Sequence, residues 1–287
     1  MSASEFDITP AALRARLDRI VGDRGPTTTA SAVRLSAVEN YLEKEFSAMG
    51  LRVESDFFSY RGRRFRNIVA RTSAQNGAPL VVLGAHFDCV EGSPGADDNA
   101  SGVAVLLESA RALSTTKLRS EVLFCAFNLE EFNMIGSSHL AKRLKSEGAN
   151  VAAMLSLEML GYTDRRPGSQ KYPPGFGWFY PDRADFLGVV GNRRSGALLK
   201  SFAAALKQID GLPVETLSVI GNGFLVPQAR LSDHAPFWDA GFPALLLTDT
   251  AFMRNPNYHT AFDTIETLDF EFMAKVCRGV VNGVARL

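Results

Sequence analysis

Segments with the apolar pattern of strands alternate with segments of helical periodicity along most of this chain. Strands are expected at 65–72, 79–85, 121–128, 151–159, 187–192 and 243–249, and helices at 32–50, 102–113, 137–148, 195–209 and near 269–285. Such alternation is typical of an α/β layered domain around a mostly parallel sheet. We therefore expect that fold. Because no repeat, low-complexity tract or linker interrupts the pattern, we expect one domain over residues 1–287.

One segment, 161–186, breaks this alternation. It is rich in Gly, Pro and aromatic residues and has no clear periodicity. A stretch of this length is too long for an ordinary connection, and long loops of this kind often form lids or pocket walls. We expect it to shape a pocket.

Charge and composition exclude several classes of protein. Lys+Arg and Asp+Glu both number 31, so no net charge attracts nucleic acid or an anionic membrane. The basic run 61–66 is interpreted as a solvated hairpin turn. The three cysteines are widely spaced and indicate neither a disulfide framework nor a CxxC metal site. With no signal-peptide pattern and no apolar run long enough to span a membrane, a cytoplasmic protein is expected. Nothing indicates an oligomeric state.

Acidic residues and histidines follow the expected strands. In open α/β sheets ligands bind beyond the carboxyl ends of the strands. The residues found there are His86 and Asp88, Asp97 and Asp98 in a glycine-rich loop, Glu130 and Glu131, Glu158, Asp249, and finally His259. Single acidic residues in loops are usually solvated, but several strand ends that deliver them to one edge point to a shared site.

A metal centre is the chemistry that fits this mixture. Zinc binds imidazole nitrogen and carboxylate oxygen, and a catalytic zinc keeps one position open. A carboxylate that bridges two ions can hold a metal pair. Mg²⁺ fits less well, because it prefers oxygen ligands and retained waters.

Six sequence blocks, in order, resemble the motif set of the di-zinc aminopeptidases, the family of bacterial leucyl aminopeptidase and aminopeptidase Y. They are "AHFD", "PGADDNASG", "NLEEFNMIGS", "LSLEMLGY", "SDHAPFWDAGFP" and "YHTAFDT", and they run from about residue 65 to about 270. Glutamate carboxypeptidase and glutaminyl cyclase are relatives in the same group. The resemblance implies a mixed, mainly parallel central sheet flanked by helices, a zinc exopeptidase-like three-layer fold.

The resemblance also implies roles for the residues at the strand ends. It implies two Zn²⁺, or other divalent ions, held by His86 and Glu158 on one side and by His259 and Glu131 on the other. Asp97 would bridge them, and the peptide bond Asp97–Asp98 would be cis. Glu130, beside a ligand but not one itself, would be the general base.

Supporting roles follow from the same resemblance. Asp88 would orient His86, and Ser232 and Asp233 are candidates to support the His259 side. Glu158 stands where many members of the family have Asp. Ala229 lies where some members carry a Tyr that helps to hold the oxyanion, and Arg230, Tyr172 or Tyr180 are possible substitutes.

The expected activity is zinc-dependent hydrolysis of peptide bonds, with removal of amino-terminal residues from a peptide substrate. His234, Phe237, Tyr172 and Arg230 are the expected pocket residues, together with Trp238 and Phe252. Three alternatives stay open: a carboxypeptidase or dipeptidase on the same di-zinc site, a glutaminyl-cyclase-like acyltransferase with one zinc, and a metal-free binding protein. Arginines at 165, 166, 183, 193, 194 and 230 are the candidates for binding a substrate carboxylate.

Overall fold

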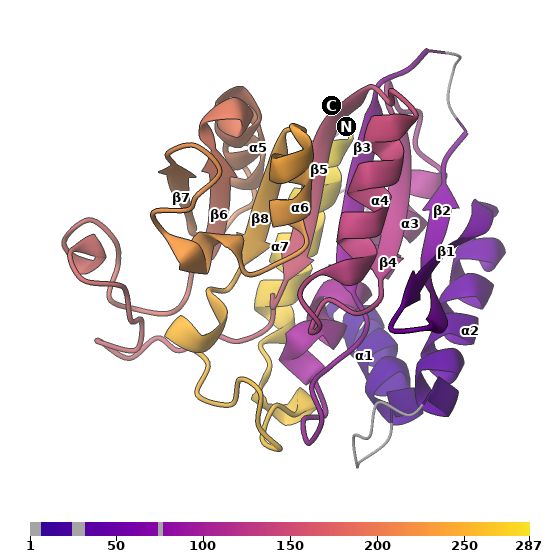
Figure 1. Cartoon of the computed structure of the whole chain (residues 1–287). Helices are drawn as coiled ribbons and strands as arrows, with labels where there is room; N and C mark the ends of the chain where they lie inside the picture. Colours follow the sequence, from indigo (N-terminus) through magenta and orange to yellow (C-terminus); the bar gives the residue numbers. More distant parts are fainter. Residues whose placement is uncertain (1–6, 25–31, 74–76) are drawn as a thin grey trace.

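An eight-stranded sheet forms the centre of the computed structural model, which describes residues 7–24, 32–73 and 77–287 (Figure 1). The strands are β1 (Arg52–Tyr60), β2 (Arg63–Arg71), β3 (Leu80–His86), β4 (Glu121–Phe127), β5 (Val151–Glu158), β6 (Leu187–Asn192), β7 (Val214–Val219) and β8 (Ala244–Thr248). Their order across the sheet is β1-β2-β4-β3-β5-β8-β6-β7.

The four central strands β4, β3, β5 and β8 run parallel to one another. The β1–β2 hairpin joins one side antiparallel, through the pairing of β2 with β4. On the other side β6 pairs antiparallel with β8 and parallel with β7. The expected mixed, mainly parallel sheet is confirmed, and the carboxyl ends of its four central strands open on one edge.

Helices cover both faces of the sheet (Figure 1). On one face a large apolar cluster joins the sheet to α1 (Pro10–Arg24), α2 (Ala32–Ala48), α3 (Gly102–Ser114), α5 (Gly196–Leu206) and α7 (Phe270–Val284). On the other face a smaller cluster joins it to α4 (Ile135–Ser146) and α6 (His234–Ala240). The three-layer architecture follows from these two buried faces.

Helix α7 illustrates how the sequence specifies this packing. Asp269 caps its first turn, because the Asp269 carboxylate accepts a hydrogen bond of 2.9 Å from the backbone N–H of Phe272. Its apolar residues recur at helical spacing and are buried against the large cluster. Gly279 allows close contact with α5, since a Cβ at that position would lie 2.7 Å from Leu206.

The structure adds four elements that the apolar pattern did not reveal: α1, α6, and the two edge strands β1 and β7. The interpretation of 61–66 as a hairpin turn is confirmed. Tyr60 pairs with Arg63, and Arg61 and Gly62 form the turn with positive φ. The side chains of β1 are mostly exposed or half-buried and those of β7 mostly half-buried, which weakens the strand signal of both.

Several further expectations can be compared with the described residues. Among their helices, none has both the length and the apolar character needed to cross a membrane. Cys125 and Cys277 are buried free thiols, as expected from their apolar surroundings. The two tryptophans differ sharply: Trp238 in α6 is 2% exposed, whereas Trp178 in the 161–186 segment is 88% exposed. Residues 1–6 of the polar N-terminal stretch lie outside the described part.

Candidate metal centre and substrate pocket

The predicted ligands converge at the edge of the sheet where the parallel strands end. His86 is the last residue of β3 and Glu158 the last residue of β5. Glu130 and Glu131 lie in the turn after β4, and His259 lies in the loop after β8. The structure brings all five of these predicted residues together. Their position agrees with the rule that α/β sheets bind ligands beyond their strand ends.

One group of donor atoms surrounds His86. Its Nε2 lies 3.3 Å from Oδ1 of Asp98 and 3.4 Å from Oε2 of Glu158. Glu130 is next to this group, with its Oε2 at 3.9 Å from the same nitrogen. All of these side chains are buried or nearly so.

A second group of donor atoms surrounds His259. Its Nε2 lies 2.9 Å from Oδ2 of Asp98 and 3.3 Å from Oε2 of Glu131. Asp98 therefore belongs to both groups, with one carboxylate oxygen facing each histidine. In each group one ligand atom from every residue lies within 4.8 Å of the others.

The prediction that Asp97 lies between the two histidines is wrong. Its carboxylate instead accepts hydrogen bonds from the backbone N–H of Gly161 (2.9 Å) and from the Asn255 side chain (2.7 Å). Burial and the neighbouring Asp249 raise the pKa of Asp97 well above its ordinary value. Asp97 thus joins three loops beneath the site, and Asp98 takes the shared position.

A kinked turn, Ala96–Ser101, whose backbone is not helical at Asp98 and Asn99, presents Asp98 to the histidines. Asp263 holds this turn, because its two carboxylate oxygens accept the backbone N–H groups of Asp97 (2.8 Å) and Asp98 (3.1 Å). The cis peptide bond joins Asp98 and Asn99, so it falls one residue later than expected. The Asn99 side chain donates to the carbonyl of Leu157 at the end of β5, at 2.8 Å.

Asp88 contacts two parts of the cluster at once. The Nδ1 atom of His86 lies 3.1 Å from the backbone oxygen of Asp88 and 3.6 Å from its carboxylate. The same carboxylate accepts the backbone N–H groups of Glu130 (3.1 Å) and Glu131 (3.2 Å). With the proton on Nδ1, the lone pair of Nε2 faces Asp98 and Glu158, so Asp88 lies where a residue that orients His86 is needed.

Ser232 was expected to support the His259 side of the cluster, but it lies on the His86 side. Its hydroxyl donates a hydrogen bond of 2.7 Å to Glu158 and lies 3.0 Å from the hydroxyl of Ser156. Asp233 is fully buried on the same side. Burial raises the pKa of Asp233 to about 7, with His86 acting in the opposite direction and Glu158 adding to the rise.

Burial dominates the electrostatics of the carboxylates. It raises the pKa of Glu130 well above its ordinary value, and it also raises the pKa of Glu131 and Glu158. For His259 burial acts downward, but hydrogen bonds with Asp98 and Glu131 raise its pKa to about 10. The carboxylates in this small volume therefore repel one another, and each ionises less readily than it would in water. A bound cation would relieve that repulsion.

The donor set fits divalent metal ions. Its donors are two imidazoles and several carboxylates. This mixture suits zinc better than Mg²⁺ or Ca²⁺, which prefer shells made of oxygen atoms alone. Nε2 of His86 and Oε1 of Glu131 are buried and make no hydrogen bond within the described residues. Buried polar atoms without partners are uncommon, and cation binding would satisfy both.

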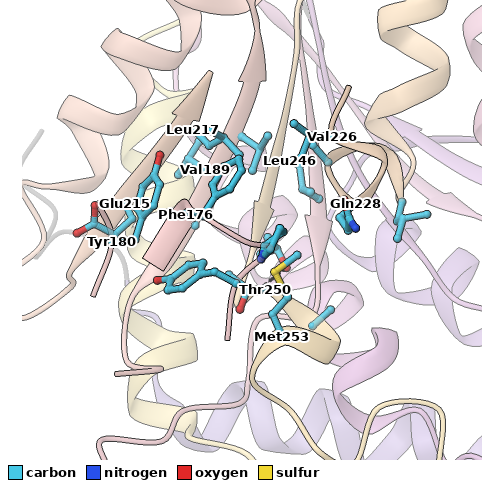
Figure 2. Close-up of a pocket in the computed structure, with 18 of the residues that line it drawn as sticks. Phe176, Tyr180, Val189, Glu215, Leu217, Val226, Gln228, Leu246, Thr250 and Met253 are labelled. Atoms are coloured by element: carbon cyan, nitrogen blue, oxygen red, sulfur yellow. Dashed lines mark hydrogen bonds between the residues drawn. The ribbon is translucent and has the colours of Figure 1, made fainter. Parts of the chain in front are cut away.

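An apolar pocket opens beside the cluster and has Glu158 of the cluster in its wall. Its walls come from the 161–186 segment, from β6, β7 and β8, and from the loops at 226–231 and 250–253; they include Tyr172, Phe176, Tyr180, Phe186, Leu217, Val226, Leu246 and Met253 (Figure 2). Part of the 161–186 segment thus lies along this pocket, and Tyr172 and Phe252 are among its lining residues.

Three other expected pocket residues lie elsewhere, as does Trp238. Phe237 and Trp238 are buried in the smaller core under α6. His234 is also buried, with its Nε2 at 2.8 Å from the carbonyl oxygen of Ala229. Arg230 forms an ion pair of 2.7 Å with Asp239. His234, Phe237 and Trp238 belong to helix α6 in the core, whereas the loop before it reaches the pocket through Val226, Gln228, Ala229 and Leu231.

Tyr258 is a site residue that sequence reasoning missed. Its ring stacks on that of His259, with centroids 3.7 Å apart, and it lines the pocket. Burial and the nearby carboxylates Asp98 and Glu131 raise the pKa of Tyr258. Its position directly before His259 was the available signal, because neighbours of a ligand often reach the same site.

Comparisons with known proteins agree with this arrangement. A model of peptidase family M28 matches residues 67–284. The protein YfbL of Escherichia coli strain K12, described as uncharacterized, is 36% identical over 268 residues, which are 90% of this chain and 82% of that protein. A probable leucine aminopeptidase of Arthroderma otae is 28% identical, and this match covers 84% of the chain but only 62% of that protein.

The fold is also that of a solved peptidase structure. BSAP, a zinc aminopeptidase from Bacillus subtilis, superposes with a TM-score of 0.78 at 18% identity, covering 98% of this chain and 96% of that one. At this identity the likeness concerns the fold.

Proposed function

This chain belongs to peptidase family M28, and on that premise we propose that it is a zinc-dependent aminopeptidase that uses two divalent ions. Members of the family are hydrolases of peptide bonds. The observation that carries the proposal is the position of Asp98, whose two carboxylate oxygens face His86 at 3.3 Å and His259 at 2.9 Å.

Each half of the cluster supplies a similar set of ligands. His86 and Glu158 would hold one ion, His259 and Glu131 the other, and Asp98 both. When bound, zinc supplies Lewis acidity, which polarises a peptide carbonyl and increases the acidity of water. The protein contributes a fixed arrangement of donors, with Asp88 and Ser232 holding His86 and Glu158 in place.

Glu130 is the proposed general base. Its carboxylate is nearly buried and lies beside the His86 group without sharing its closest contacts. It would accept the proton of the attacking water and then donate it to the departing amine, which requires one carboxylate within reach of both. The backbone N–H of Glu130 is bound by Asp88, so the base and the histidine are positioned by the same residue.

Tyr258 is proposed to assist the carbonyl oxygen of the substrate. Since burial and neighbouring carboxylates raise the pKa of Tyr258, the phenol keeps its proton and can donate a hydrogen bond. Charge that develops on the carbonyl oxygen is best stabilised by such a fixed donor. This role replaces the expected contribution of Arg230, which is paired with Asp239.

The surroundings favour recognition of a free amino group over a free carboxylate. Binding a terminal carboxylate calls for an Arg or Lys near the metal ions. Among the residues described as lining the pocket there is neither Arg nor Lys. Of the arginines considered, Arg166 is paired with Asp164 and Arg230 with Asp239. Carboxylates, in contrast, surround the place where an α-amino group would lie.

One peptide prepared in three forms tests the proposal: free at both ends, N-acetylated, and C-amidated, each with and without added zinc. Acetylation should abolish cleavage and amidation should leave the rate nearly unchanged. The reverse pattern would identify a carboxypeptidase. Formation of pyroglutamate from a peptide with N-terminal Gln, without hydrolysis, would identify a cyclase.

The number of ions is tested separately by elemental analysis of protein incubated with zinc and freed of excess. Two ions per chain are expected. A stoichiometry of one, or none, would reject the two-ion model, whatever the activity.

A further inference from the structure

Four residues in one row across the sheet connect the metal centre to the far end of the pocket. Glu158 on β5 pairs with Thr248 on β8, Thr248 with Gly188 on β6, and Gly188 with Glu215 on β7. Residues paired in register point to the same face of a sheet. All four line the pocket. Three strand spacings separate the Cα atoms of Glu158 and Glu215, roughly 14 Å.

Gly188 leaves the middle of this row open. As a glycine it fills no space between Thr248 and Glu215, and a Cβ there would already lie 3.3 Å from the carbonyl oxygen of Thr248. This row therefore forms one wall of the pocket, with Glu158 at one end and Glu215 at the other, and we call the space along it the channel. Apolar side chains line it, among them Leu217, Leu246 and Val226 (Figure 2).

The far end of the channel combines a carboxylate with aromatic rings. Figure 2 shows Glu215 beside Tyr180, and the charge of Glu215 contributes to raising the pKa of both Tyr180 and Tyr172, after burial as the main cause. The three rings of Tyr172, Phe176 and Tyr180 pack on one another with centroids 5.8 and 6.4 Å apart. Carboxylate and aromatic faces together are typical of sites that bind organic cations.

Glu215 has no cation of its own. Within the part of the chain that the structure describes, its side chain makes no ion pair and no hydrogen bond. The buried guanidinium of Arg254 faces Phe186 and donates to the Phe186 carbonyl (2.9 Å) and to Gln170 (3.0 Å). A half-buried carboxylate at the end of an apolar channel is thus left for a ligand.

Given the proposed aminopeptidase function, we propose that the channel receives the side chain of the substrate's first residue and prefers a long aliphatic stem with a cationic end, as in arginine or lysine. The stem lies along Leu217 and Leu246, and Glu215 supplies the counter-charge. Long basic side chains combine in this way an apolar body with a polar tip. The α-amino group stays beside the carboxylates of the metal centre.

Pairs of substrates that differ only in charge test this proposal. Peptides beginning with Arg are compared with peptides beginning with citrulline, and Lys with norleucine. The protein should cleave the charged member of each pair with a kcat/KM about tenfold higher. Glu215→Gln keeps the shape of the side chain and should bring both ratios close to one.

Matched variants guard against a general loss of structure. Glu54→Gln removes an exposed carboxylate on β1, the opposite edge of the sheet, and should keep the wild-type ratios. Glu215→Lys should favour an N-terminal Glu peptide over its Gln counterpart. The proposal is overturned if wild-type Arg and citrulline peptides react equally, or if Glu215→Gln lowers kcat/KM for Leu and Arg peptides alike.

A binding measurement separates this inference from the proposed function. Glu130→Gln protein is titrated calorimetrically with argininamide and citrullinamide. Tighter binding of argininamide, lost in Glu130→Gln/Glu215→Gln, supports the cationic channel even if no peptide is hydrolysed. Equal binding rejects the channel, while cleavage of the Leu peptide would leave the aminopeptidase proposal standing.

Discussion

Asp97 and Asp98 are adjacent in the chain, but their carboxylates face different parts of the molecule. Asp98 meets the two histidines, whereas Asp97 is bound by Gly161 and Asn255 beneath the site. Both backbone N–H groups are held by Asp263, so neither side chain can exchange its place with the other without breaking this clamp.

Asp98→Asn should therefore abolish binding of both metal ions, because it removes the one carboxylate shared by the two histidine groups. Asp97→Asn should keep the metal stoichiometry and act on stability instead. Elemental analysis and thermal unfolding distinguish the two variants. Loss of metal from Asp97→Asn alone would reverse the assignment of the two residues.

Replacement of Glu130 should separate chemistry from metal binding. Glu130→Gln keeps the size of the side chain but cannot accept a proton, so kcat should fall by about two to four orders of magnitude. Metal content should stay at the wild-type level. A variant that retains most of its activity would exclude Glu130 as the base.

Ser232→Ala should weaken one ion selectively. It removes the 2.7 Å hydrogen bond to Glu158, and the loss of such a supporting contact typically lowers metal affinity about 10- to 100-fold. Competition with a chelator measures the effect. Ser201→Ala, which loses only a hydrogen bond within α5, is the control and should behave as wild type.

Tyr258→Phe should lower kcat by about tenfold or more, with little change in KM, since the lost hydrogen bond matters most as charge develops on the carbonyl oxygen. Stacking on His259 is kept, so metal content should not change. A rise in KM at constant kcat would instead assign Tyr258 to substrate binding.

The stability of the protein should depend on His234. Burial lowers the pKa of His234 to about 4, whereas an unfolded histidine titrates near 6.5. Between these values the unfolded state binds more protons, so the free energy of unfolding decreases as pH falls from about 6.5 to about 4, by up to about 3 kcal/mol. Denaturant titrations of wild type and His234→Gln check this: their difference should vary only in that window.

Most of the sheet and most of the cluster follow from the sequence. Central strands such as β3 and β4 are buried on both faces, so their apolar runs are continuous and easy to recognise. The edge strands β1 and β7 are partly solvated and lack such runs. Helix α6 has only seven residues, too few to display a period.

The errors at the site have a different origin. Sequence order identified the Asp-Asp pair, but which of the two carboxylates faces the histidines depends on the turn at 96–101 and on Asp263, which is far away in the chain. Ser232 and Phe237 share one motif, yet one contacts Glu158 and the other packs in the core. Glu215 belongs to none of the sequence motifs. Its position at the pocket follows only from the register of β7 against β6.

The two tryptophans make the protein suited to optical measurement. Trp178 is almost fully exposed on the segment that carries Tyr172 and Tyr180, whereas Trp238 is buried between α6 and the sheet. A water-soluble quencher should therefore extinguish the emission of Trp178 and leave that of Trp238. The quenched and the unquenched emission then report separately on the segment beside the substrate channel and on the interior, without any added label.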